Sequence, residues 1–199
     1  GVPVYNASHL FGFFSVFNAD ALNHVELIKG GFPARYGGRL SSVIDINMKD
    51  GNMKEVKGEG SIGLIASKIS VEGPIKEDKT SFLFSARRTY IDILARPLIR
   101  LATEGESAGY YFYDLNLKLN HIINDKNRLY LSTYTGDDKA YSRYESFYVD
   151  DNERTDYKDE FGLRWGNIIT AIRWNHVFSP KLFGNFTGTF SRYRVDIFE

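Results

Sequence analysis

The chain has 199 residues, with 25 lysines and arginines balancing 25 aspartates and glutamates, 43% hydrophobic residues and no cysteine. A zero formal charge argues against nucleic-acid binding, because nucleic-acid-binding modules normally carry a basic excess. The lack of cysteine excludes disulfide scaffolds, cysteine zinc sites and cysteine catalysis. No apolar run approaches the roughly 20 residues of a transmembrane helix, which leaves open a transmembrane barrel whose strands need only about 9–11 residues each.

The first part of the chain reads as the middle of a longer protein, because no signal peptide begins it. Residues 1–18 are apolar and aromatic without a regular period, which is typical of either a buried loop or a ligand-facing loop. Asn18, followed by helix-forming residues, predicts a short helix over residues 18–22. His9 and His24 are isolated histidines, since nothing in the sequence places a second ligand beside either.

Residues 25–51 predict two β-strands joined by a glycine-rich loop. Glycine pairs at 30–31 and 37–38 permit positive φ angles, and Pro33 fixes one further dihedral, so we expect the loop to hold a defined shape. It is not a Walker A loop, because Lys29 precedes the glycines, and the spacing of a dinucleotide-binding fingerprint is absent. An ordinary glycine-rich turn of a β protein remains an alternative.

From residue 54 onward, the sequence predicts strands separated by turns and loops. The expected strands are two within residues 54–73 and one each over residues 81–90, 110–120, 128–135, 161–178 and 182–195. The 110–120 strand has the clearest alternation. One of its faces carries Leu115, Leu117 and Leu119, and the other carries Asp114, Asn116, Lys118 and Asn120.

The connections between these strands are of two kinds. Short turns near residues 76, 125 and 180 mostly alternate with long connections near residues 100 and 148, the second being a charged loop over residues 137–159. This sorting, with aromatic residues near the strand ends, is typical of a transmembrane barrel. In a soluble sandwich the leucines of the 110–120 strand would instead face a core, and alternation alone leaves both readings open.

No constellation of catalytic residues stands out, so we expect no enzymatic activity, no cofactor and no metal site. Residues 91–101 could form a helical turn within the connection near residue 100. The acidic residues 150–153 lack the glycine and terminal glutamate of an EF-hand, so a solvated loop is the expected reading. His121 and His176 each lie near a short turn, where a solvated or interfacial role is expected.

The spacing of residues 26–46 resembles the C-terminal part of the plug domain of TonB-dependent outer-membrane receptors. That motif runs approximately Glu-Val-Leu-Lys/Arg-Gly-Pro, then Tyr-Gly, then Gly-Val-Ile-Asn-Ile. Gly31 stands where proline is usual, and Ser42 stands where glycine usually precedes the last strand. The matching positions, expected to have structural or gating roles, are Glu26, Lys29, Gly30, Arg35, Tyr36 and Gly37, to which the basic residue Arg39 is added.

The sequence of residues 30–43 and the Ser-x-Arg-Arg-x-Tyr-x-Asp pattern of residues 85–92 are similar to sequences in a Bacteroidota branch of these receptors. They are less similar to the glycan-importing branch that works with a surface lipoprotein, and whether such a lipoprotein partner exists stays open. Because they lie beside the shaped glycine loop, Arg35 and Arg39 are candidates for ion pairs with barrel carboxylates that hold the plug, and solvated arginines are the alternative.

The resemblance implies a mainly all-β fold, with a small α+β plug portion in residues 1–52 and about seven strands of a barrel in residues 53–199. Such barrels close with about 22 strands around a plugged lumen. Seven strands alone would leave unpaired edges, so we expect them not to form a stable functional unit.

The implied function is energy-coupled uptake of a scarce solute, such as an iron chelate, cobalamin or a glycan, across the outer membrane of a Gram-negative cell. The partners would be outer-membrane lipid, a small extracellular ligand and the TonB energy-coupling complex, which would be contacted through a segment outside this chain. The alternative is a soluble β-rich binding or adhesion module, with residues 141–148 contacting a glycan. A passive porin is disfavoured, because the plug-like region would block its pore.

Overall fold

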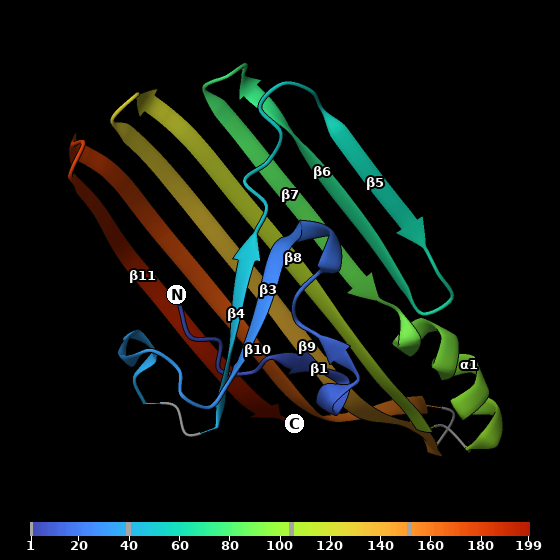
Figure 1. Cartoon of the computed structure of the whole chain (residues 1–199). Coiled ribbons are helices and arrows are strands. Elements are labelled where there is room, and N and C mark those ends of the chain that lie inside the picture. The colour runs from blue at the N-terminus through green and yellow to red at the C-terminus, as the bar shows by residue number, and fades with distance from the viewer. Residues whose placement is uncertain (1, 39–40, 104–105, 151–152) are drawn as a thin grey trace.

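The computed structural model describes residues 2–38, 41–103, 106–150 and 153–199. Seven antiparallel strands form one sheet in the order β11-β10-β9-β8-β7-β6-β5, so each strand pairs with its neighbours in sequence (Figure 1). The strands are β5 (Lys57–Ile62), β6 (Ala66–Lys76), β7 (Thr80–Thr89), β8 (Glu106–Asn124), β9 (Asn127–Asp150), β10 (Glu153–Ser179) and β11 (Leu182–Phe198). The prediction of a mainly all-β, antiparallel architecture is confirmed.

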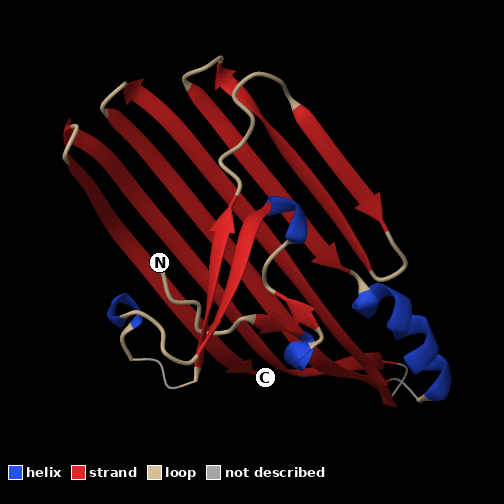
Figure 2. Cartoon of the chain, in the orientation of Figure 1, coloured by secondary structure: helices blue, strands red, loops and turns tan. Residues whose placement is uncertain are grey.

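Residues 2–52 form a layer that lies across one face of this sheet, and we call them the N-terminal layer (Figure 2). It contains two small antiparallel sheets, one of β1 (Ser8–His9) with β2 (Phe14–Ser15) and one of β3 (Leu22–Lys29) with β4 (Ser42–Met48). The helical turns in its described part are 3₁₀-helices at Leu10–Gly12, Ala19–Ala21 and Ala34–Tyr36. The α-helical component expected for this region is therefore replaced by 3₁₀ turns.

The glycine-rich loop between β3 and β4 has the conformation that its sequence predicts. Gly30 and Gly31 have φ angles of 65° and 52°, which lie in the left-handed region that residues with a Cβ rarely adopt. The Tyr36 hydroxyl donates a hydrogen bond to Asp45 Oδ2 at 2.7 Å, which ties the loop to β4. The two strands pair in register from Val25 with Ile46 to Lys29 with Ser42.

The start of the layer is hydrogen-bonded to strands that come much later in the sequence. Asn167 Nδ2 on β10 donates to the carbonyl oxygen of Asn6 at 3.1 Å, and Ser191 Oγ on β11 donates to that of Pro3 at 3.3 Å. At its other end the layer joins the sheet through Gly51, whose φ is 83°. A Cβ added at Gly51 would lie 2.4 Å from the carbonyl oxygen of Phe82, so only glycine fits this crossing.

The prediction of a long loop over residues 137–159 is wrong. β9 continues to Asp150 and β10 begins at Glu153, while residues 151–152 lie outside the described part of the chain. Opposite charges face each other across these two strands: Glu160 lies 2.7 Å from Lys139 and Lys158 lies 3.8 Å from Glu145. Cross-strand ion pairs of this kind let a highly charged sequence remain a strand.

The connection near residue 100 is more regular than predicted. Residues of the expected helical turn form a 12-residue helix, α1 (Ile91–Ala102), with Pro97 inside it. The short turns near residues 76, 125 and 180 all lie at the opposite end of the sheet, as predicted (Figure 1). Within the described residues, no helix combines the length and the apolar character needed to cross a bilayer.

The two faces of the sheet are arranged in the opposite sense from a soluble sheet. The face under the N-terminal layer is buried and largely polar, and its buried side chains include those of Ser81, Ser85, Asp114, Asn116, Lys118 and Asn120. The other face is apolar and open to solvent, and its exposed side chains include those of Ile69, Phe84, Leu115, Leu117, Ile168, Ile172 and Phe190. We call these the inner face and the outer face.

Candidate functional site between the N-terminal layer and the sheet

A deeply buried polar cluster is centred on His9, which lies in β1. Its Nε2 is 2.6 Å from Asp114 Oδ1 on β8, and its Nδ1 is 2.6 Å from Asp138 Oδ2 on β9. The histidine side chain is 2% exposed and the Asp114 side chain 0%. An ionised carboxylate only accepts hydrogen bonds, so a ring that bridges two such carboxylates donates from both nitrogens, as an imidazolium does.

A second cation completes the charge balance of this cluster. Arg87 on β7 donates from Nε to Asp114 Oδ2 at 2.7 Å, and from Nη2 to the carbonyl oxygen of Ser15 at 2.6 Å. With His9 protonated, two cations therefore face the two carboxylates of Asp114 and Asp138. A neutral, hydrogen-bonded cluster is the form in which buried charges are tolerated.

Two tyrosines and an aromatic ring enclose the carboxylates. The Tyr110 hydroxyl donates to Asp138 Oδ1 and accepts from the backbone N–H of Leu10 at 2.6 Å. The Tyr134 hydroxyl donates to Asp114 Oδ1 at 3.0 Å. The His9 ring stacks on Phe112 with ring centroids 4.0 Å apart. These contacts fix the layer to β8 and β9 and exclude water from the ion pairs.

The pKa of His9 reflects two opposed effects. Burial lowers it, but the hydrogen bonds from His9 to Asp114 and Asp138, together with their charges, outweigh burial and raise the pKa above the ordinary value of 6.5. A raised pKa means that folding favours the protonated ring. The stabilisation is therefore fully present below the ordinary pKa and is lost as the pH rises through the raised value.

We expect the attachment of the N-terminal layer to weaken with rising pH. Limited proteolysis of the full-length protein in detergent, from about pH 6 to about pH 10, should show the layer protected at the acidic end and increasingly cleaved as His9 loses its proton. A His9→Asn variant should lose this pH dependence. Equal protection of the unaltered protein across the range would contradict the expectation.

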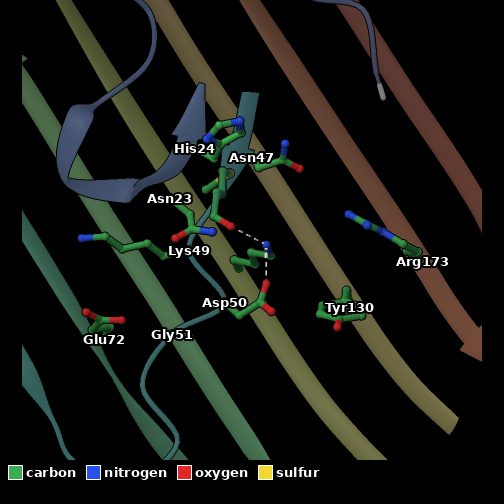
Figure 3. A pocket seen from close by; sticks show the side chains of 11 residues that line it. Asn23, His24, Asn47, Lys49, Asp50, Gly51, Glu72, Tyr130 and Arg173 are labelled. Carbon is green, nitrogen blue, oxygen red and sulfur yellow. Dashed lines mark hydrogen bonds and ion pairs between the residues drawn. The ribbon is translucent and has the colours of Figure 1, made fainter. Parts of the chain in front are cut away.

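A second polar contact lies at the end of the layer, where β4 leaves towards the sheet (Figure 3). Lys118 Nζ, on the inner face of β8, donates to the carbonyl oxygen of Met48 at 2.8 Å and lies 2.7 Å from Asp50 Oδ1. Arg128 Nη2 lies 3.5 Å from Asp50 Oδ2. The Lys118 side chain is 6% exposed and that of Asp50 is 43% exposed, so water reaches this ion pair from the Asp50 side.

Beside this contact lies an open, strongly polar cavity of about 620 Å³ between the layer and the sheet. Figure 3 shows Lys49, Asp50 and His24 from the layer facing Glu72, Tyr130 and Arg173 from the sheet. Its lining is mixed in charge. Among the described residues, no three histidine or acidic side chains are grouped so that they could hold a metal ion.

A further ion pair joins the layer to the sheet at Asp20. Lys68 on β6 lies 2.7 Å from Asp20 Oδ2, close to the Asn18 side chain that caps the 3₁₀-helix Ala19–Ala21. Asp20 and Asp50 of the layer thus meet cations of the sheet, whereas His9 meets its carboxylates. Within the described residues, ion pairs therefore join the layer to the inner face in three separate places.

The structure shows contacts for only some residues of the motif over residues 26–46. Glu26 pairs in register with Asp45 on the β3–β4 hairpin, whose Oδ2 accepts from Tyr36. Lys29 and Gly30 lie where β3 enters the loop, and Gly37 follows the 3₁₀-helix Ala34–Tyr36. Arg39 and the side chain of Arg35 lie outside the described residues, so their pairing with barrel carboxylates stays a prediction.

Sequence reasoning missed the role of His9, which it treated as isolated. The partners Asp114 and Asp138 lie 105 and 129 positions away, so no local motif links them. One signal was available: the alternation of β8 places Asp114 on a polar face that needs compensating cations.

No protein-family model, no curated protein and no solved structure matches this chain.

Proposed function

We propose that this chain is the plug-and-barrel part of a TonB-dependent outer-membrane receptor that takes up a scarce solute. The observation that carries the proposal is the inverted sheet, with a buried polar inner face and an exposed apolar outer face. A soluble sheet buries its apolar face, whereas a membrane barrel turns that face to lipid and its polar face to the lumen.

The outer face has the dimensions expected for a bilayer. A row of paired residues crosses six strands: Val71, Phe84, Leu117, Thr133, Thr170 and Phe190. Along β10, the outward positions from Ile168 to Phe178 include Ile172 and Trp174 and no lysine, arginine, aspartate or glutamate. That stretch matches the roughly 9–11 residues with which a barrel strand crosses a membrane.

The apolar band ends abruptly towards the end of the sheet that carries α1. There the outward positions of β9 and β10 become charged and paired, with Arg164 Nε lying 2.8 Å from Asp137 Oδ1 and Lys139 lying 2.7 Å from Glu160. This change supports a membrane boundary, beyond which the β9–β10 hairpin extends into water. At the other border, Trp174 stacks with Phe186 at 5.3 Å, as in an interfacial aromatic belt.

The N-terminal layer occupies the place of a plug, since it covers the face that would line the lumen. Its contacts are discrete ion pairs and hydrogen bonds, which favour an attachment that is specific and can be released. The edge strands β5 and β11 of the described sheet do not pair with each other. Further strands would complete the barrel, because open edges are not tolerated in lipid.

The proposal includes the partners that the resemblance implies: outer-membrane lipid, an extracellular ligand and an energy-coupling complex that acts on the layer. It also assigns the protein to the outer membrane of a Gram-negative cell. A surface lipoprotein would be an additional partner only for a receptor of the glycan-importing kind.

Cell fractionation tests this proposal directly. We expect mass spectrometry to find these residues in the outer-membrane fraction, in a protein that migrates differently on gels before and after heating because its barrel resists detergent. Recovery of a soluble species that needs no detergent would contradict the proposal and favour a soluble β-rich binding or adhesion module. Ion conductance without an energy source would instead favour a passive porin.

A further inference from the structure

A second cavity, of about 340 Å³, lies between the start of the N-terminal layer and strands β10 and β11. Its volume falls in the range of small-molecule sites, which is about 300–1,000 Å³. We call it the aromatic cleft. Its lining residues are Tyr5, Asn6, Ser8, Leu163, Trp165, Tyr193 and Val195.

Aromatic rings form much of the surface of the aromatic cleft. Trp165 is 6% exposed and packs on Tyr110 with ring centroids 6.2 Å apart, so its position is fixed. Tyr5 and Tyr193 are 68% and 40% exposed, so their rings are available to a ligand. Fixed and accessible rings of this kind bind ligands that offer a flat apolar face.

The polar groups at the aromatic cleft are neutral. Asn6 and Ser8 line it from the layer. Asn167, which pairs in register with Tyr193, is 4% exposed, and its Oδ1 has no hydrogen-bond partner within the described residues. Buried amide oxygens normally have a partner, so this atom is an unfilled acceptor on the strand next to Tyr193, although it does not itself line the cleft.

The aromatic cleft and the cavity beside Lys118 differ in the charge of the side chains that line them. That cavity is lined by Lys49, Asp50, Glu72, Lys118 and Arg173, whereas none of the described residues that line the aromatic cleft is charged. Along β10, Trp165 and Arg173 are eight positions apart, which corresponds to roughly 27 Å of strand. The two ends of the layer therefore offer different chemistry, and the aromatic cleft lies at the end nearer α1.

We propose that the aromatic cleft binds a neutral, ring-bearing ligand, with the ring face against Trp165 and Tyr193 and neutral polar groups at its edge. A sugar ring and an aromatic ring share this chemistry. The inference rests on the proposed function, because it takes the cleft to be part of the path of the imported solute. It narrows the solute to neutral ring compounds and disfavours strongly charged chelates.

Calorimetric titration of the full-length protein in detergent tests this inference. The probes are 4-nitrophenyl glucoside, which carries both kinds of ring, then maltotriose and benzyl alcohol to separate the two, with citrate and spermidine as charged comparisons. We expect saturable binding of at least one neutral probe, and a loss of at least tenfold in affinity in a Tyr193→Ala variant. Tyr157→Ala, which alters an exposed tyrosine of β10 outside the cleft, should bind as the unaltered protein does.

Three outcomes would overturn the inference: tighter binding of citrate or spermidine, no binding of any neutral probe, or unchanged affinity after Tyr193→Ala. The same preparations should be tested for outer-membrane recovery and for heat-dependent migration. If these remain normal while ligand binding fails, the receptor proposal stands and only the cleft assignment is wrong. If both fail, the receptor proposal itself is wrong.

Discussion

Replacing His9 with alanine is expected to detach the N-terminal layer from the sheet. The change removes one of two cations and leaves the buried carboxylates of Asp114 and Asp138 facing Arg87 alone. Breaking a buried ion pair by removing one partner typically costs about 3–5 kcal/mol. In the full-length protein, the layer should become sensitive to protease under conditions in which the barrel is still intact.

The matched control is His24→Ala, because His24 is an exposed histidine of the same layer. It should leave protease resistance unchanged. Adding Asp138→Asn to His9→Ala should restore part of the resistance, since the cluster then holds one carboxylate and one guanidinium. If His9→Ala leaves the layer fully protected, the cluster does not hold the layer in place.

Placing an arginine at Leu117 is expected to impair insertion into a bilayer. Leu117 lies on the outer face of β8, between Phe84 and Thr133 in the central row of the apolar band. A charged side chain facing lipid near the middle of a bilayer costs about 2–4 kcal/mol in a membrane barrel. Refolding into lipid vesicles, followed by the gel shift on heating, should show a smaller folded fraction.

The control for this variant is Val149→Arg, which places the same charge at an exposed position of β9 beyond the apolar band. It should refold as the unaltered protein does. In a soluble protein Leu117 would be a surface residue, and its replacement by arginine would cost almost nothing. Equal folded fractions for both variants would therefore contradict the membrane assignment.

The strands could be predicted from the sequence where alternation was carried by apolar residues. Leu115, Leu117 and Leu119 opposite Asp114 and Asn116 indicated both a strand and its two faces, and the structure has these faces in β8. The sequence did not indicate which face is covered, because alternation is the same in a soluble sheet and in a barrel.

The largest error, the loop expected over residues 137–159, has a specific cause. The many charged residues of this segment were interpreted as the sign of a solvated loop. In the structure, charged side chains of β9 and β10 form ion pairs across the two strands, such as Arg143 with Glu160. The partner of a charge on a strand depends on register, and register is a property of two segments rather than of one.

The candidate site was the least predictable part, for a related reason. His9 acquires its chemistry from Asp114 and Asp138, which belong to two other strands. The motif of residues 26–46 correctly indicated a shaped loop at Gly30 and Gly31, yet the described ion pairs with the sheet come from Asp20, Asp50 and His9.

The hydrogen bonds from Asn167 to Asn6 and from Ser191 to Pro3 join residues 161 and 188 positions apart. The start of the N-terminal layer therefore reaches its final position only after β10 and β11 have formed. Contacts this remote form slowly, because the loop between them must close first. Until then the apolar side chain of Val16, which clusters with Ile169 of β10, stays uncovered, so we expect this segment to need a chaperone.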